Sequence, residues 1–360
     1  MKRKILIIVP SLEGGGAEKF IVKLSNNLDR NKFIIYLVIL NSLNSVYIDD
    51  LKEDLIIFNF YYKKIRFSAI KIIKLIWFIR PDILFTTLVH LNMLIGVLGI
   101  LFPRRMKVYG RETIILSKLY EHSKYLWFLK KIYPYLYLAF DKIISQSSDM
   151  ENDLINNFGL KKNKSIVINN PIDFDRINEM ALLPIVNNPF IKDGVTINFV
   201  SCGRLEYQKG FDLLIEAISI CKINLNLVIL GSGVEKDRLI ELARNFNVLE
   251  KINFVGFQIN PYQFFKNADA FILSSRYEGF PNVILEAIAC GTPVIAMPAP
   301  GGIIEILKDI DGCLVSKNVS ASSLADSILS FKSKYRLHSS SINKYRMDRI
   351  IRSYETNFLD

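Results

Sequence analysis

Two glutamates lie eight positions apart in the segment with the clearest chemical potential, Arg276–Glu286, which follows a short apolar run. Gly279 and Pro281 are typical of a loop that leads into a helix, where backbone N–H groups point outward. Glu278 falls in that loop, and Glu286 falls about one turn into the helix. Two carboxylates so placed can accept hydrogen bonds from separate sets of sugar or ribose hydroxyls. The alternative is a charge in the first helical turn beside a solvated glutamate.

Cations and glycines mark two further strand ends in the second half of the chain. Gly203 and Arg204 follow the apolar run Ile197–Cys202, and Lys209 comes five residues later. The planar fork of Arg204 and the compact charge of Lys209 suit a diphosphate. Gly231 follows the next apolar run, and open parallel sheets bind ligands at this edge. Surface cations and a turn without a ligand are the alternatives.

A glycine-rich turn separates the first apolar run, Ile5–Val9, from the first helical pattern. Gly15 and Gly16 belong to this turn, where backbone N–H groups can approach a phosphate at the positive end of a helix. The turn does not match the GxGxxG pattern of dinucleotide-binding proteins, which disfavours NAD. A plain tight turn is the alternative.

These segments together resemble glycosyltransferase family 4. The resemblance rests on the E-x7-E spacing of Glu278 and Glu286, on Gly203-Arg204-Leu205, on Lys209-Gly210 and on the N-terminal Gly-Gly-Gly-Ala-Glu turn. It covers essentially the whole chain, with all elements in order. It implies a retaining enzyme of GT-B fold that uses a nucleotide-activated sugar as donor.

The resemblance also implies a role for each segment. Arg204 and Lys209 would hold the donor diphosphate and stabilise its charge as the glycosidic bond breaks. Glu286 would bind the ribose, and Glu278 would face the donor sugar. The donor-binding set is completed by residues of the N-terminal glycine turn, of two strand ends and of the glutamate loop: Gly15, Gly16, Gly203, Gly231, Gly279, Phe280 and Asn282.

His90 follows the apolar run Ile83–Thr87, and in the family a histidine at this place often touches the donor sugar. The resemblance therefore adds His90 to the catalytic set, although a packed histidine is the alternative. Arg111 and Glu112 follow another strand and are candidates for acceptor contact, with a surface ion pair as the alternative. The Gly301–Glu305 segment resembles a later donor-seating turn of the family.

No cofactor and no metal are expected. Asp173 and Asp175 imitate a metal-binding DxD pattern, but they follow a turn into a predicted helix. The four cysteines have no CxxC spacing, and three histidines give no zinc pattern. Scattered cysteines favour a reduced cytoplasmic compartment.

The net charge of +11 comes from 46 basic and 35 acidic residues and is concentrated in the first half of the chain. Residues 1–150 hold 23 basic and 12 acidic residues, and the segments 61–80 and 118–137 mix lysine and arginine with tyrosine and tryptophan. Such segments suit the headgroup layer of an anionic membrane. Nucleic acid is excluded as a partner, because no nucleic-acid-binding signature is present. An ordinary amphipathic surface is the alternative.

Two series of short apolar runs alternate with helical patterns, which predicts the α/β class. We expect two Rossmann-like doubly wound domains that face a central cleft, as in the GT-B fold. The predicted divisions are an acceptor- and membrane-facing domain at 1–175, a linker at 176–195, a nucleotide-sugar domain at 196–338 and a returning helix at 339–360. Residues 83–103 lack charges, but their polar groups favour a strand and a buried helix over a membrane span.

The sequence thus predicts a glycosyltransferase that moves a hexose or N-acetylhexosamine from a UDP-sugar to a glycan, with a polyprenyl-diphosphate-linked acceptor for a surface polysaccharide. We expect it in the cytoplasm, attached peripherally to the inner face of the cell membrane. A UDP-sugar 2-epimerase of the same architecture and a non-catalytic scaffold of a polysaccharide assembly complex are the alternatives.

Overall fold

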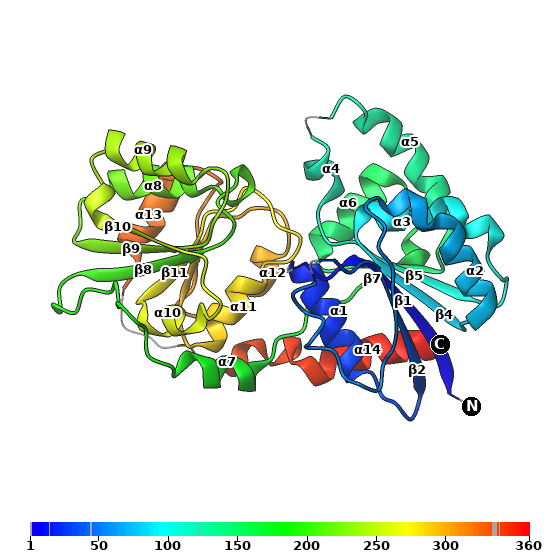
Figure 1. Cartoon of the computed structure of the whole chain (residues 1–360). Coiled ribbons are helices and arrows are strands. Elements are labelled where there is room, and N and C mark those ends of the chain that lie inside the picture. Colours follow the sequence, from blue (N-terminus) through cyan, green and yellow to red (C-terminus); the bar gives the residue numbers. More distant parts are fainter. Residues whose placement is uncertain (1, 14, 44, 122, 333–336, 338) are drawn as a thin grey trace. The chain divides into compact units, whose positions relative to one another are not determined.

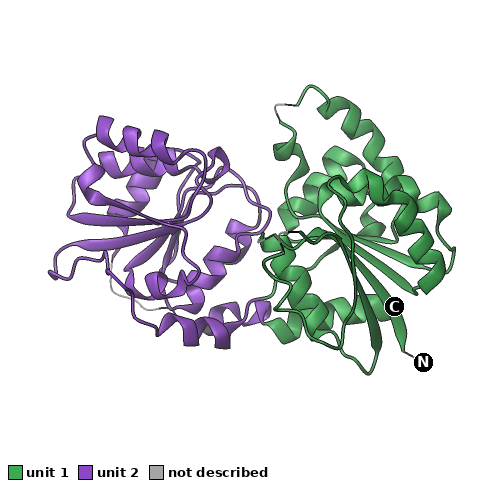
Figure 2. Cartoon of the chain, viewed as in Figure 1, with its two compact units in different colours: residues 1–171, 347–360 green, residues 172–346 purple. Residues whose placement is uncertain are grey.

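The computed structural model describes the whole chain except residues 1, 14, 44, 122, 333–336 and 338, and it divides into two compact units (Figure 2). Unit 1 comprises residues 1–171 and 347–360, and unit 2 comprises residues 172–346. The chain therefore passes into unit 2 slightly before the predicted end of the first domain.

Unit 1 is built on a parallel sheet of seven strands in the order β3-β2-β1-β4-β5-β6-β7. The direction of strand addition reverses between β1 and β4, which makes this the switch point of a doubly wound sheet. The strands are β1 (Arg3–Ser11), β2 (Phe33–Asn41), β3 (Ile56–Asn59), β4 (Ile83–Thr87), β5 (Lys107–Arg111), β6 (Lys142–Ser145) and β7 (Ser165–Val167).

Helices cover both faces of this sheet, because its central strands are apolar on both sides. Along β1, Ile5 and Ile7 enter the core beneath α1 and α14, whereas Leu6 and Ile8 enter the core beneath α2, α3 and α6. The helices of unit 1 are α1 (Gly16–Asn27), α2 (Ala69–Ile79), α3 (Val89–Leu98), α4 (Leu116–Leu119), α5 (Leu126–Leu136), α6 (Ser148–Phe158) and α14 (Met347–Leu359).

The C-terminal helix α14 is an integral part of unit 1. The ring of Phe358 packs 5.7 Å from Phe85 and 5.2 Å from Tyr109, and Tyr354 also meets Phe85, at 5.9 Å. Glu355 accepts a hydrogen bond from Lys32 Nζ at 2.9 Å. The last residues of the chain thus complete the core that the first residues begin.

Unit 2 is built on a second parallel sheet, of six strands in the order β10-β9-β8-β11-β12-β13. Strands β10, β9, β8 and β11 of this sheet are labelled in Figure 1. Its strands are β8 (Ile197–Cys202), β9 (Leu225–Leu230), β10 (Ile252–Gly256), β11 (Ala270–Leu273), β12 (Val294–Ala296) and β13 (Leu314–Val315). Its helices are α7 (Phe174–Ala181), α8 (Phe211–Ile220), α9 (Lys236–Asn245), α10 (Tyr262–Asn267), α11 (Asn282–Ala289), α12 (Ile303–Leu307) and α13 (Ala321–Ser330).

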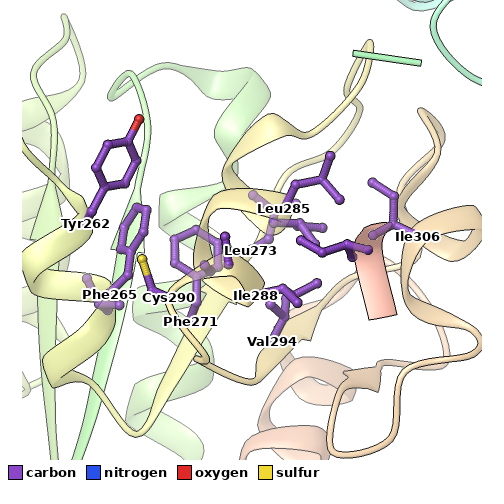
Figure 3. Close-up of a cluster of buried hydrophobic side chains, with 14 of the residues drawn as sticks. Tyr262, Phe265, Phe271, Leu273, Leu285, Ile288, Cys290, Val294 and Ile306 are labelled. Atoms are coloured by element: carbon purple, nitrogen blue, oxygen red, sulfur yellow. The ribbon is translucent and has the colours of Figure 1, made fainter. Parts of the chain in front are cut away.

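One face of this sheet holds α11, the helix that carries Glu286. Leu285 and Ile288 of α11 pack with Phe271 and Leu273 of β11 in a cluster of buried apolar side chains (Figure 3). Leu285 and Ile288 are at most 1% exposed, so this face fixes the helix firmly against the sheet.

The predicted linker at 176–195 is instead part of unit 2. Helix α7 buries Ile177 in the core of this unit, and Phe190 is also buried there. Asn198 Nδ2 donates to the Ile191 carbonyl at 2.7 Å, and Asn226 Nδ2 donates to the Pro189 carbonyl at 3.0 Å. The prolines and asparagines of this segment are typical of turns. The buried amides of Asn198 and Asn226 fasten these turns to the sheet.

Residues 83–103 form the strand β4, the helix α3 and a short 3-10 turn. This confirms the predicted strand and buried helix. Among the described residues, no helix has the length and apolar character needed to cross a membrane.

We expect Phe358→Ala to lower the free energy of unfolding by about 3–5 kcal/mol, because it removes a ring that is 1% exposed and leaves a cavity. Denaturant unfolding measures the change. Phe78→Ala is the control, since its ring is 82% exposed and its loss should change stability by less than about 0.5 kcal/mol. Equal effects of the two substitutions would contradict the packing of α14.

Candidate functional site

The carboxyl ends of neighbouring strands in unit 2 bring the predicted donor-binding segments together. Strand order places the ends of β9, β8, β11 and β12 side by side. Figure 1 labels the first three of these strands. Gly203 follows β8 and donates from its N–H to the Leu230 carbonyl of β9 at 3.0 Å. Gly231 follows β9 and donates to the Gly256 carbonyl at 2.8 Å. The loop that contains Glu278 follows β11.

An ion pair joins two of the predicted catalytic residues. Lys209 Nζ lies 2.7 Å from Glu278 Oε1, and these side chains are only 18% and 7% exposed. Ser275 Oγ donates to the same carboxylate oxygen at 2.5 Å. A partly buried carboxylate that accepts two hydrogen bonds is held in one orientation. The pair therefore places a fixed anion and a fixed cation together at the sheet edge.

The loops that carry Lys209 and Glu278 are hydrogen-bonded along their backbones. The Arg276 N–H donates to the Gln208 carbonyl at 2.8 Å, and Gln208 Nε2 donates to the Tyr277 carbonyl at 3.0 Å. Ser274 Oγ donates to the Lys209 carbonyl at 2.9 Å. These bonds connect segments 69 and 65 residues apart in the sequence, so the ion pair rests on a rigid support.

Arg276 strengthens this support. Among the described residues, its side-chain hydrogen bonds go to Tyr207 and Asp212 and not to the ion pair. Its two terminal nitrogens donate to both carboxylate oxygens of Asp212, at 2.8 and 2.7 Å. The guanidinium also lies 4.0 Å from the centre of the Tyr207 ring. Sequence reasoning assigned no role to Arg276 and Asp212, because only the fold reveals that they are partners.

Two glycines allow the loops to approach this closely. Gly210 has φ +62°, and a Cβ added there would lie 2.1 Å from the Ser274 carbonyl oxygen. Gly301 has φ +127°, and its Cβ would lie 2.3 Å from the Glu278 carbonyl oxygen. Both backbones thus need glycine for conformation and for space.

The loop before α11 was predicted to offer its backbone amides from Gly279 to Asn282 to the donor sugar, and the placement of the Phe280 side chain is compatible with this prediction. The Phe280 side chain is buried and packs 5.7 Å from the Tyr345 ring, so it anchors the loop and leaves only its backbone for a ligand. Asn282 is the first residue of α11, and Gly279 precedes it in the buried part of the loop.

Glu286 lies on α11, half-buried, and its Oε1 accepts a hydrogen bond from the Tyr262 hydroxyl at 3.4 Å. The nearby Cys202 thiol ends β8, and burial, reinforced by the charge of Glu286, raises the pKa of that thiol to about 12. Cys202 is therefore a neutral packing residue. Neither Tyr262 nor Cys202 was assigned to the site from sequence, although Cys202 directly precedes Gly203.

Arg204 is the exposed member of the predicted diphosphate pair. Its side chain is 69% exposed and lies 3.2 Å from Glu206 Oε1. An exposed pair of this kind contributes little free energy, so the guanidinium is free to turn toward a ligand.

In unit 1, the predicted glycine turn and His90 occupy the carboxyl ends of β1 and β4. Gly15 is the N-cap of α1, and Gly16 is its first residue. His90 lies in the first turn of α3 with an exposed side chain, which rules out the packed-histidine alternative.

The structure contradicts both predictions for Arg111 and Glu112, contact with an acceptor and a surface ion pair. Both are completely buried, so they neither face an acceptor nor form a surface ion pair. Arg111 donates to Asn170 Oδ1, and its guanidinium lies 3.8 Å from the centre of the Phe20 ring. Burial raises the pKa of the Glu112 carboxyl to about 7, against the opposing effect of a hydrogen bond from Asn92.

The Asp173-Phe174-Asp175 segment forms the start of helix α7. Asp173 Oδ1 accepts the Arg176 N–H at 3.2 Å and so caps α7. In the part of the chain that the structure describes, no group of three histidine, cysteine or acidic residues is placed to hold a metal ion. Glu305 lies in the first turn of α12, which begins after Gly302.

Comparisons with known proteins connect this geometry to a family. The family model described as Glycosyltransferase Family 4 matches residues 14–176, and the one described as Glycosyl transferases group 1 matches residues 189–347. The chain is 30% identical over 318 residues to the N-acetylgalactosamine-N,N'-diacetylbacillosaminyl-diphospho-undecaprenol 4-alpha-N-acetylgalactosaminyltransferase of Campylobacter jejuni, covering 85% of this chain and 84% of the relative. It is 25% identical over 321 residues to the amylovoran biosynthesis glycosyltransferase AmsD of Erwinia amylovora, covering 87% and 85%.

Solved structures agree on the fold. Anabaena HepE in complex with UDP and glucose is similar with a TM-score of 0.77 and 16% identity, covering 99% of both chains. Sucrose-phosphate synthase of Thermosynechococcus elongatus is similar with a TM-score of 0.78 and 17% identity, covering 99% of this chain and 98% of that one. These likenesses confirm the predicted GT-B fold class with two Rossmann-like domains.

We expect Gly210→Ala to destabilise unit 2 by about 1–3 kcal/mol more than Gly194→Ala. Both glycines have positive φ, at +62° and +79°, but a Cβ at Gly194 meets nothing within 4 Å. The pair of substitutions therefore separates the clash with the Ser274 carbonyl from the backbone conformation itself. Denaturant unfolding measures both, and equal losses would contradict the close approach of the two loops.

Proposed function

The chain belongs to glycosyltransferase family 4, and from this premise we propose that it moves a hexose or N-acetylhexosamine from a UDP-sugar to a glycan on a polyprenyl diphosphate. The transfer retains the anomeric configuration and serves the synthesis of a surface polysaccharide. One observation carries the proposal: the Lys209–Glu278 ion pair at the carboxyl edge of the unit 2 sheet. The Campylobacter relative, named for a diphospho-undecaprenol-linked acceptor, supports the acceptor class, and the Anabaena structure in complex with UDP and glucose supports the nucleotide.

In the proposed reaction, Lys209 and Arg204 stabilise the diphosphate as negative charge develops on the leaving group. Lys209 is already oriented by Glu278, so little reorganisation accompanies donor binding. Arg204 turns from its weak pairing with Glu206 toward the phosphates. Arginine suits this step, because its planar fork binds phosphate oxygens in pairs.

The two glutamates take different parts of the donor. Both recorded hydrogen bonds to the Glu278 carboxylate fall on Oε1, which leaves Oε2 for hydroxyls of the sugar. Glu286 accepts ribose hydroxyls, with the long bond from Tyr262 keeping it oriented. His90 acts near the reacting carbon, as the family resemblance implies.

We further propose that the reaction needs no metal. The candidate diphosphate site offers Lys209, which is held by Glu278, and Arg204, which can turn toward the phosphates. Cations that neutralise the leaving group supply the charge stabilisation that a divalent ion would otherwise provide.

We propose that unit 1 attaches peripherally to the inner face of the membrane. Residues 55–80 contain six basic and no acidic residues. A groove of about 860 Å³ between β3 and α2 is lined by Phe67, Ile70 and Phe78 together with Lys71 and Lys74. Ile70 and Phe78 are 70% and 82% exposed, so apolar and cationic groups are offered together, as an anionic bilayer surface requires.

We expect Lys209→Ala to lower kcat for sugar transfer by about 10²–10³, because it removes charge stabilisation of the leaving diphosphate. Glu278→Ala should abolish transfer while circular dichroism stays unchanged. Glu241→Ala is the control, since Glu241 pairs with Arg244 on an exposed helix face. The assay uses a panel of UDP-sugars with a synthetic prenyl-diphosphate glycan, read by mass.

Two further arms of that assay test the rest of the proposal. A chelator should leave the rate unchanged, and a metal requirement would refute the metal-free mechanism. A UDP-sugar incubated without acceptor should keep its configuration at C2, whereas its conversion would favour the 2-epimerase. Full activity of Glu278→Ala would remove Glu278 from the site.

Lys71→Glu combined with Lys74→Glu should weaken binding to anionic vesicles by at least about tenfold, because each lysine near the surface contributes about 1 kcal/mol. Flotation with vesicles of phosphatidylglycerol and phosphatidylcholine measures the binding. Lys222→Glu combined with Lys236→Glu gives the same change of net charge in unit 2 and serves as the control. Loss of binding in both double variants, or in neither, would contradict attachment through this groove.

A further inference from the structure

The turn between β4 and α3 holds an aliphatic residue in an unusual backbone conformation. Leu88 has φ +76° and ψ 136°, outside the regions that residues with a Cβ ordinarily occupy. Such a conformation costs free energy and persists only where the surrounding structure imposes it. His90, the candidate catalytic histidine, comes two residues later with an exposed side chain.

The Asn92 side chain ties the first turn of α3, which follows Leu88, to the edge of the sheet. Its Oδ1 accepts from Thr86 Oγ1 at 2.8 Å, and its Nδ2 donates to the Arg111 carbonyl at 3.0 Å and to Glu112 Oε1 at 3.1 Å. Its backbone N–H donates to the Leu88 carbonyl at 3.0 Å. Asn92 is 2% exposed, so these bonds tie α3 to the ends of β4 and β5 with little competition from water.

Glu112 is in turn fixed from several sides. Its N–H donates to the Ile144 carbonyl at 3.0 Å, and its own carbonyl accepts from Gln146 Nε2 at 3.0 Å. The side chain is fully buried, and its Oε2 has no recorded partner. A buried carboxyl with one unpaired oxygen is unfavourable for stability. The hydrogen bond that its other oxygen accepts from Asn92 orients the Asn92 amide.

We propose that Asn92, oriented by Glu112, is a positioning residue that maintains the strained Leu88 turn and thereby holds His90 at the carboxyl end of β4. The inference rests on the proposed catalytic role of His90. Without the amide, Leu88 relaxes to an ordinary conformation and the first turn of α3 moves. A displacement of about 1 Å at a catalytic group is enough to cost up to about 10²-fold in rate.

A double-mutant cycle tests whether Asn92 acts through His90. We expect Asn92→Ala to lower kcat by about 10–100-fold in the wild-type background and by less than about twofold in a His90→Ala background. The inference would be overturned if the two substitutions lowered kcat independently, so that their effects multiplied in the double variant. It would also be overturned if Asn92→Ala lowered kcat and His90→Ala did not. Asn198→Ala removes a comparable buried amide in unit 2 and should lower stability without lowering kcat.

Relief of the strain provides a rescue. Glycine adopts positive φ readily, so Leu88→Gly should restore much of the activity lost in Asn92→Ala. Absence of rescue would count against the strained turn as the cause. If Asn92→Ala does not fold, Glu112→Gln and Glu112→Met replace it. The glutamine keeps an acceptor for Asn92 and should preserve kcat, whereas the methionine should lower it, and equal effects would overturn the inference.

Amide hydrogen exchange separates this inference from the proposed function. Asn92→Ala should accelerate exchange at residues 88–92, and Leu88→Gly in the same chain should reverse part of the change. If the wild-type protein transfers no sugar, the proposed function is wrong. The hydrogen-exchange measurement still tests whether Asn92 maintains the Leu88 turn. Unchanged exchange at residues 88–92 would overturn the inference even in an active enzyme.

Discussion

The ion pair between Lys209 and Glu278 is the interaction on which the candidate donor site depends. Removing two charges from water is costly, and only close geometry and further hydrogen bonds compensate for it. Ser275 supplies one such bond, and the backbone bonds between the two loops supply the geometry. The sheet order of unit 2 makes this possible, because it sets β8 beside β11 and so joins segments 69 residues apart. Gly210 then lets the loops approach closely enough for the pair to form.

The strands and the fold class were predictable because local patterns encode them, and the roles of the site residues stay predictions. Parallel strands buried on both faces read as short apolar runs, and Ile83–Thr87 and Ile197–Cys202 have the bounds predicted from sequence. What escaped prediction depends on contacts between distant segments. The burial of Arg111, the inward side chain of Phe280 and the pairing of Arg276 with Asp212 leave no signal in their own neighbourhoods. The turn-rich segment 176–195 looked like a linker because the amides that fasten it lie elsewhere in the sequence.

Unit 1 uses polar groups in two contrasting ways. At the carboxyl edge of its sheet, Asn92, Arg111 and Glu112 form a buried polar network whose members restrain one another. Around the groove of α2 and β3, exposed cations lie beside exposed aromatic and aliphatic side chains. The network favours a rigid sheet edge. The groove is the surface that we propose to contact an anionic membrane, and its lysines are exposed, whereas Arg111 is buried in the network.

The position of the diphosphate in a crystal structure with an intact UDP-sugar tests the central claim most directly. We predict Lys209 Nζ within about 3 Å of a diphosphate oxygen, Arg204 turned from Glu206 onto the phosphates, and Glu278 accepting a hydroxyl of the sugar. A nucleotide-sugar bound elsewhere, with Lys209 in contact only with Glu278, would contradict the account.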